Sequence, residues 1–147
     1  MKFDGTNQQI TYPATNSPDH SVEVWFKAND LNSTQGLIGE GSYYRLYLAN
    51  NTLYWWNREA GSGTSTSISY FSIDTNEWYH AVGVTKSGLE RKLFLNGIEV
   101  SSENTNLNFD TGTTNGAIAN RWPNSNSFFN GKIAGVKKYN RALSADE

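Results

Sequence analysis

The stretch SYYRLYLANNTLYWWNRE, residues 42–59, contains two strand-like runs joined by a tight turn. Asn50 and Asn51 lie at its centre, and asparagine tolerates the positive φ that a two-residue hairpin turn needs. Side chains alternate between the two faces of a strand, and directly opposite residues share a face. A turn at these two residues therefore gives the predicted hairpin one core face, made of Tyr44, Leu46, Leu48, Leu53 and Trp55.

The opposite face of this hairpin is aromatic and carries a positive charge. Arg45 lies opposite Trp56 in the predicted register, where its guanidinium can stack on the indole or pair with a ligand carboxylate. Flat rings also offer stacking surfaces to the apolar C–H faces of sugars. A purely structural interpretation stays open, because Tyr and Trp favour strands wherever they point and the loop at residues 62–66 can cover the rings. The candidate binding residues of this face are Tyr43, Arg45, Tyr47, Tyr54 and Trp56.

Other parts of the chain show the same strand pattern. SVEVWFKA (residues 21–28) alternates apolar with other side chains, and LERKLFLNGIEVSS (residues 89–102) contains Asn96-Gly97, a strong hairpin signal. No convincing helical periodicity occurs before the last few residues. About ten to twelve short runs separated by turn residues predict a single all-β domain, either a sandwich or a barrel.

The composition narrows the range of partners. The chain has 147 residues and a formal net charge of −2, which favours neither nucleic acid nor an anionic membrane. No apolar run is long enough to span a bilayer, and the opening MKFDGTNQQI lacks the apolar segment of a signal peptide. Cysteine is absent, which excludes disulfides, thiol nucleophiles and cysteine-ligated metals. We therefore expect no nucleic-acid partner and no membrane insertion.

Four segments match a known family in their order and spacing: FDGTNQQITYP (3–13), SVEVWFKA (21–28), EWYHAVGVTKSG followed by RKLFLNGIEV (77–100), and FFNGKIAGVKKYNRALSADE (128–147). They resemble the laminin-G-like, concanavalin A-like lectin and glucanase domains over essentially the whole chain. The resemblance implies a jelly-roll β-sandwich of two antiparallel sheets. Such domains are usually non-catalytic; many bind glycans, some bind proteins and some need calcium. It also implies a location outside the cell, on a cell surface or in a virion.

Two departures from the family pattern bear on chemistry. Where many members carry Asp-Glu, this chain has Ala134-Gly135, so any carboxylate role of that pair is lost. The related glucanases carry Glu-x-Asp-x-x-Glu on one strand, and no segment here contains it. Retaining hydrolysis needs two carboxyl groups only about 5–5.5 Å apart. Asp74 and Glu77 fall on opposite faces of an extended chain, so we expect no enzymatic activity.

The segment NRWPNSNSFF (residues 120–129) places a tryptophan in a predicted loop. Loops at the end of a rigid sandwich often carry function. Trp122 is therefore a candidate stacking platform for a sugar, with Arg121, Asn124 and Asn126 as hydrogen-bonding neighbours. The alternative is that Trp122 folds back as a lid over the end of the sandwich.

Calcium is the metal that the sequence leaves open. This ion takes about six to eight oxygen ligands, led by carboxylates and completed by carbonyls. In NFDTGTTNG (residues 108–116), the candidate ligands are Asp110 and Asn115 together with backbone carbonyls. No dense acidic loop supports this site, so absence of calcium is the alternative.

The chain ends in LSADE (residues 143–147), where Ser144 precedes Glu147 by three residues as in a helix-starting capping box. Because the chain stops where such a helix would begin, we expect residues 1–147 to be one domain cut from a longer protein. A frayed tail is the alternative.

Taken together, these patterns predict a non-catalytic recognition module of a larger extracellular or virion protein, with a glycan or a glycosylated surface as its partner. The alternative is a structural or adhesion domain of a phage particle or surface assembly that contacts protein.

Overall fold

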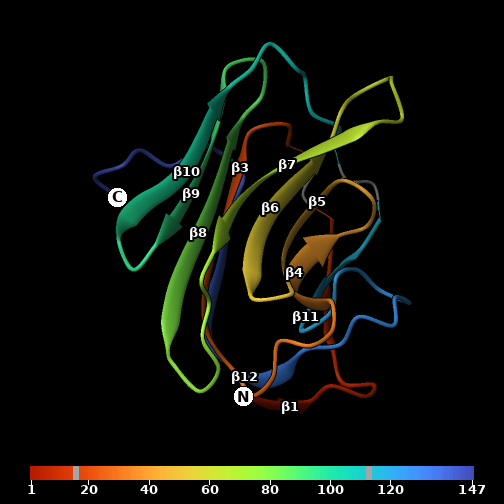
Figure 1. Cartoon of the computed structure of the whole chain (residues 1–147). Helices are drawn as coiled ribbons and strands as arrows, with labels where there is room; N and C mark the ends of the chain where they lie inside the picture. The colour runs from red at the N-terminus through yellow and green to blue at the C-terminus, as the bar shows by residue number, and fades with distance from the viewer. Residues whose placement is uncertain (15–16, 112–113) are drawn as a thin grey trace.

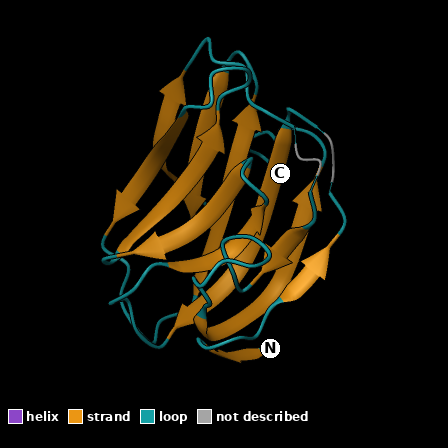
Figure 2. Ribbon diagram, turned by 90° about the vertical axis from the view of Figure 1, so that its right-hand side faces the viewer, coloured by secondary structure: helices purple, strands orange, loops and turns teal. Residues whose placement is uncertain are grey.

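The computed structural model describes residues 1–14, 17–111 and 114–147, and it contains two six-stranded sheets (Figure 1). Sheet A contains, in spatial order, β1 (Lys2–Asp4), β12 (Asn130–Tyr139), β3 (His20–Ala28), β8 (Tyr79–Lys86), β9 (Glu90–Leu95) and β10 (Ile98–Asn104). Sheet B contains β2 (Ile10–Tyr12), β11 (Gly116–Ile118), β4 (Gln35–Glu40), β5 (Tyr44–Ala49), β6 (Thr52–Arg58) and β7 (Ser65–Phe71). Strand pairings among these residues are antiparallel, and Figure 2 shows only strands and loops. The predicted all-β sandwich is confirmed.

The hairpin of β5 and β6 has the predicted register. Asn50 and Asn51 both adopt positive φ, at 48° and 61°, and they form the turn between the two strands. Arg45 pairs with Trp56, and Tyr47 pairs with Tyr54. The short polar turn therefore fixes which side chains of this hairpin face the core.

The core lies between the two sheets. The predicted core face of the hairpin is confirmed, because Leu46, Leu48, Leu53 and Trp55 are completely buried. Sheet A supplies the opposing layer, and its completely buried apolar side chains include Val22, Val24, Phe26, Ala28, Ala81, Leu93 and Ile133. The alternation in SVEVWFKA thus separates a core set from an outer set.

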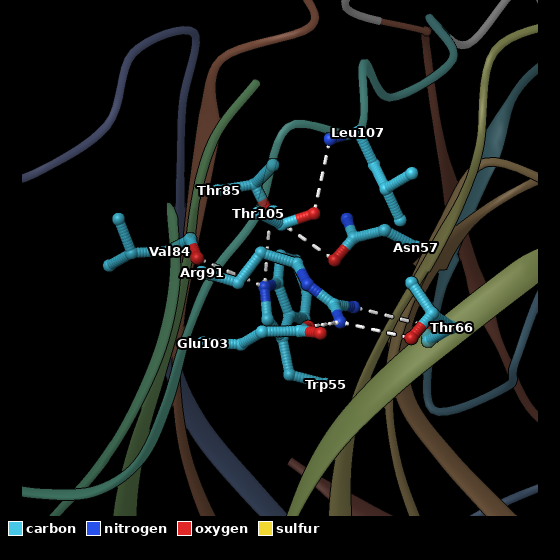
Figure 3. A network of polar contacts seen from close by, with 9 residues as sticks. All are labelled: Trp55, Asn57, Thr66, Val84, Thr85, Arg91, Glu103, Thr105 and Leu107. Carbon is cyan, nitrogen blue, oxygen red and sulfur yellow. Dashed lines mark hydrogen bonds and ion pairs between the residues drawn. The ribbon is translucent and has the colours of Figure 1, made fainter. Parts of the chain in front are cut away.

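A polar network joins the two sheets near Trp55 (Figure 3). The Trp55 indole N–H donates to Thr85 Oγ1 at 3.0 Å, and this hydroxyl donates to Asn57 Oδ1 at 3.2 Å. Arg91 of sheet A donates to the Thr66 carbonyl of sheet B at 3.0 Å and forms an ion pair with Glu103. Buried polar groups need such partners, so this network stabilises one arrangement of the sheets.

At the chain end, the carboxylate of Glu147 accepts a hydrogen bond from the backbone N–H of Ser144 at 3.1 Å. This contact is one half of the predicted capping box. Arg141 also pairs with Glu147, at 2.6 Å.

Over residues 1–14, 17–111 and 114–147, no helix is long and apolar enough to cross a membrane.

Candidate ligand-binding site

The loop that follows β11 lies against the outer face of β4. Two glycines of β4 make this approach possible. A Cβ atom added at Gly36 would lie 2.0 Å from the backbone nitrogen of Arg121, and one added at Gly39 would lie 1.9 Å from the Arg121 carbonyl oxygen. Both separations are far below van der Waals contact, so only glycine permits the loop backbone to rest directly on the sheet.

This placement brings Trp122 onto the outer face of the hairpin. The Cζ atom of Arg45 lies 4.0 Å from the centroid of Trp56 and 4.0 Å from that of Trp122. A guanidinium at this distance from an indole makes a favourable cation–π contact. The two candidate sites predicted separately from the hairpin and from the loop are therefore parts of one cluster.

Arg121 extends the same cluster. Its Cζ atom lies 4.8 Å from the centroid of Trp122 and 4.9 Å from that of Tyr47. Tyr47 in turn stacks on Tyr54, with centroids 4.9 Å apart and planes inclined by 10°. We call the six side chains the arginine–aromatic cluster; they are Trp56, Arg45, Trp122, Arg121, Tyr47 and Tyr54.

The two arginines of this cluster have no carboxylate partner among the described residues. Arg45 is only 8% exposed, and its Nε atom is closed to solvent without a hydrogen-bond acceptor. Burial, and after it the positive charge of Arg121, lowers the pKa of Arg45 to about 10. Burial also lowers the pKa of Arg121. At neutral pH, Arg45 still carries its charge.

A groove of about 620 Å³ opens beside this cluster, with Trp122 as a shared residue. Its aromatic walls are Tyr43 and Trp122, and its polar groups include Arg58, Asn115 and Asn124. The remaining lining comes from Gly41, Ser42, Thr114 and Pro123. The groove thus combines apolar ring surface with amide and guanidinium hydrogen-bonding groups.

The predicted binding residues lie partly in the arginine–aromatic cluster and partly in the groove beside it. Tyr43, Trp122 and Asn124 line the groove, whereas Asn126 is exposed and does not. Trp122 is half-buried under Arg45, so it is neither an open platform nor a sealed lid. The segment that covers the hairpin rings is residues 120–122.

Arg58 is a groove residue that the sequence reasoning missed. It continues the period-two alternation of Tyr54 and Trp56 along β6, so the same face rule would have included it. Its Nε atom lies 3.7 Å from the carboxylate of Asp110, and both side chains are about one third exposed. An exposed pair at this distance holds its arginine only weakly.

The predicted calcium ligands lie on either side of a part of the chain outside the described residues, Gly112 and Thr113. Asp110 pairs with Arg58, and Asn115 lines the groove. Within the described residues, no group of three or more His, Cys, Asp or Glu side chains could hold a metal ion. Calcium binding at Asp110 and Asn115 stays a prediction.

Two facing antiparallel sheets with a loop-built groove on an outer face define a β-sandwich of the lectin-like class. The family model described as the concanavalin A-like lectin/glucanases superfamily matches residues 4–147. This chain belongs to that superfamily. Among curated protein sequences, none is significantly similar to it.

Solved structures share the fold at low sequence identity. Domain 4 of AbnA, a GH43 extracellular arabinanase from Geobacillus stearothermophilus solved with arabinotriose, has a TM-score of 0.77 and 20% identity, and the match covers 99% of this chain and 72% of that chain. The CBM40 domain of the Ruminococcus gnavus IT-sialidase, bound to α2,3 sialyllactose, has a TM-score of 0.74 and 14% identity, with 96% and 94% covered. The receptor binding domain of botulinum neurotoxin D has a TM-score of 0.74 and 16% identity. There the match covers 99% of this chain but only 41% of the toxin domain.

Proposed function

We propose that this chain is a non-catalytic recognition module that binds carbohydrate in the groove beside Trp122. The observation that carries the proposal is the lining of that groove, which combines two aromatic rings with amide and guanidinium groups around a volume of about 620 Å³. Binding pockets for small ligands typically measure about 300–1,000 Å³ and combine apolar walls with a few polar groups.

Each type of lining side chain has a role in this proposal. Tyr43 and Trp122 contact the apolar C–H faces of a sugar ring. Asn115, Asn124 and Arg58 donate hydrogen bonds to its hydroxyl or carboxylate oxygens. A single groove of this size gives weak binding, so we expect tight attachment to a glycosylated surface to depend on several copies acting together.

Two structures of the same fold support this proposal. The arabinanase domain was solved with arabinotriose and the CBM40 domain with sialyllactose. Both ligands are oligosaccharides, and both proteins share the fold of this chain.

The absence of an acid pair in the groove supports a non-catalytic role. No aspartate or glutamate is among the described residues that line it. Glu23 lies on the other sheet and pairs with Lys137 at 3.1 Å. Retaining glycoside hydrolysis requires two carboxyl groups about 5–5.5 Å apart, so the proposed groove binds sugar without cleaving it.

The proposed setting is a larger extracellular, cell-surface or virion protein in which this chain is one domain. Its proposed partner is a glycan or a glycosylated surface. The extracellular arabinanase domain and the toxin receptor binding domain have the same fold and support this setting.

A second candidate function, contact with protein in a larger assembly, is favoured by a different surface. Trp25 on β3 of sheet A and Trp78, which directly precedes β8, are each 43% exposed. Exposed large aromatic side chains are typical of protein interfaces. If this surface makes protein contacts, the chain should bind its assembly partner through Trp25 in a sugar-independent way, and Trp25→Ser should abolish this binding.

A glycan array tests the carbohydrate proposal directly. We expect the native chain to bind at least one saccharide class, and Tyr43→Ala to lose this binding. Trp78→Ala is the matched control, because it removes an exposed aromatic ring that does not line the groove. No binding to any saccharide at high protein concentration would contradict the proposal.

A further inference from the structure

Positive charge gathers around Trp122 in a chain whose formal net charge is −2. Arg45 and Arg121 each place their Cζ atom within 5 Å of the Trp122 centroid, at 4.0 Å and 4.8 Å. Arg58 lines the same groove as Trp122. Two guanidinium groups therefore contact the Trp122 ring, and a third belongs to the lining of the groove that Trp122 also lines.

Few negative charges offset this cluster. Asp110 lies 3.7 Å from Arg58, but both side chains are partly exposed and the pair is loose. The neighbouring carboxylate, that of Glu59, accepts hydrogen bonds from Ser62 and Thr64 in the adjacent loop. Arg45 and Arg121 form no ion pair and no side-chain hydrogen bond with a described residue.

Arg91 is a buried arginine whose partners are other residues of this chain. Arg91 is completely buried, and its Nη atoms donate to Thr66 and to the carboxylate of Glu103 (Figure 3). Its Nε atom lacks an acceptor, as do those of Arg45 and Arg121. Arg45 and Arg121 differ from Arg91 in their Nη atoms, which have no carboxylate or other acceptor among the described residues, whereas those of Arg91 do.

The Nη atoms of Arg45 and Arg121 keep some solvent-exposed surface. The Nε atoms of both arginines are closed to solvent and have no partner. Their Nη atoms also lack a partner but are not closed to solvent. The Nη groups therefore meet solvent beside the ring of Trp122. A guanidinium fork matches the two oxygens of a carboxylate or sulfate, and a partly desolvated guanidinium gains more from such an anion than an exposed one.

We propose that the groove beside Trp122 selects acidic saccharides, whose carboxylate or sulfate group is held by Arg58 and by the free Nη atoms of the arginine–aromatic cluster. This proposal rests on the proposed function and names its ligand class. The uncharged part of the ligand contacts Tyr43 and Trp122, and the anionic group is directed toward the guanidinium groups.

An array of matched pairs tests this proposal. Each neutral saccharide is printed beside an acidic counterpart: glucose with glucuronic acid oligomers, galactose with galacturonic acid oligomers, lactose with sialyllactose and with sulfated lactose. We expect each neutral saccharide to bind about tenfold more weakly than its acidic counterpart, or not at all. A loss of about tenfold is the effect expected for one charge-assisted hydrogen bond. The uronic, sialylated and sulfated arms separate the sources of the anion.

The outcomes separate this inference from the proposed function. Equal binding of acidic and neutral partners, or preference for neutral ones, overturns the acidic selectivity and leaves carbohydrate binding intact. No binding to any member overturns both.

Two variants then test which arginines select the anion. Arg58→Gln and Arg121→Gln should each weaken binding of the acidic saccharide about tenfold, measured by titration calorimetry on protein whose melting temperature is unchanged. Arg141→Gln is the matched control, because Arg141 is exposed and pairs with Glu147 at the chain end. For the native protein, raising NaCl from about 0.05 to 0.5 M should weaken the same binding several-fold. Binding that is insensitive to salt and to both substitutions would overturn the proposal.

Discussion

The guanidinium of Arg45 lies 4.0 Å from the centroid of Trp122, and this contact joins a strand to a loop that is distant in sequence. Arg45 also lies 4.0 Å from Trp56 on the neighbouring strand. One arginine between two indoles thus fixes the position of the loop that forms one wall of the groove. The charge that holds this loop is also the charge that we propose to attract the ligand.

Replacing Arg45 should destabilise both the fold and the site. Arg45→Ala removes two cation–π contacts and the packing of a nearly buried side chain, so we expect the free energy of unfolding in urea to fall by roughly 1–3 kcal/mol. Arg141→Ala, at an exposed position, should change it by less than about 0.5 kcal/mol. Equal stability of the Arg45 variant and the native chain would contradict the role of Arg45 in holding the loop.

Gly39 does not line the groove, but its replacement should displace the loop that forms one wall of it. An added Cβ would lie 1.9 Å from the Arg121 carbonyl oxygen, so Gly39→Ala should move the loop, change the fluorescence of Trp122 and abolish saccharide binding. Gly63→Ala is the control. Gly63 has φ of +71° and no heavy atom within 4 Å of an added Cβ, so this change should cost about 1 kcal/mol of stability and leave binding unchanged. Normal binding by Gly39→Ala would show that the close backbone approach is not needed.

His20 should make the protein sensitive to acid. Burial lowers the pKa of His20 to about 4, whereas an unfolded histidine titrates near 6.5. Between these values the unfolded state binds more protons, so stability falls as the pH drops from about 6.5 to 4. The stability lost over this window is on the order of 3 kcal/mol.

Urea unfolding at several pH values measures this effect. His20→Gln should flatten the pH dependence in that window. A His20→Gln protein with the same pH dependence as the native chain would rule out His20 as its source.

Calcium binding by Asp110 and Asn115 predicts a concentration-dependent melting temperature. An ion that binds only the native state stabilises it by mass action, so millimolar calcium should raise the midpoint above that measured with chelator. Asp110→Asn should remove the difference. Identical midpoints with calcium and with chelator would reject the site.

The sequence predicts the fold and the two faces of the hairpin well, because both depend on local rules. Asn50 and Asn51 fix the hairpin turn, and period-two alternation then assigns Trp55 to the core and Trp56 to the outer face. The same rule would have added Arg58 to the candidate residues.

The contact between Arg45 and Trp122 could not be predicted in this way. It depends on where a loop crosses a sheet, and this path is set by long-range packing over Gly36 and Gly39. Two glycines three residues apart in one strand do indicate a close backbone approach. They do not reveal which segment approaches.

The indole N–H signals of the five tryptophans offer the most direct measurement of the central claim, that the groove beside Trp122 binds saccharide. Nitrogen-15 NMR spectra are recorded while an acidic oligosaccharide identified on the array is added, with signals assigned by single Trp→Phe variants. We predict that the Trp122 signal shifts with saturation and that Trp56 follows it through Arg45. The signals of Trp25 on β3 and Trp78 before β8 should stay in place. Shifts confined to Trp25 and Trp78, or no shift of Trp122 at saturating ligand, would contradict the account.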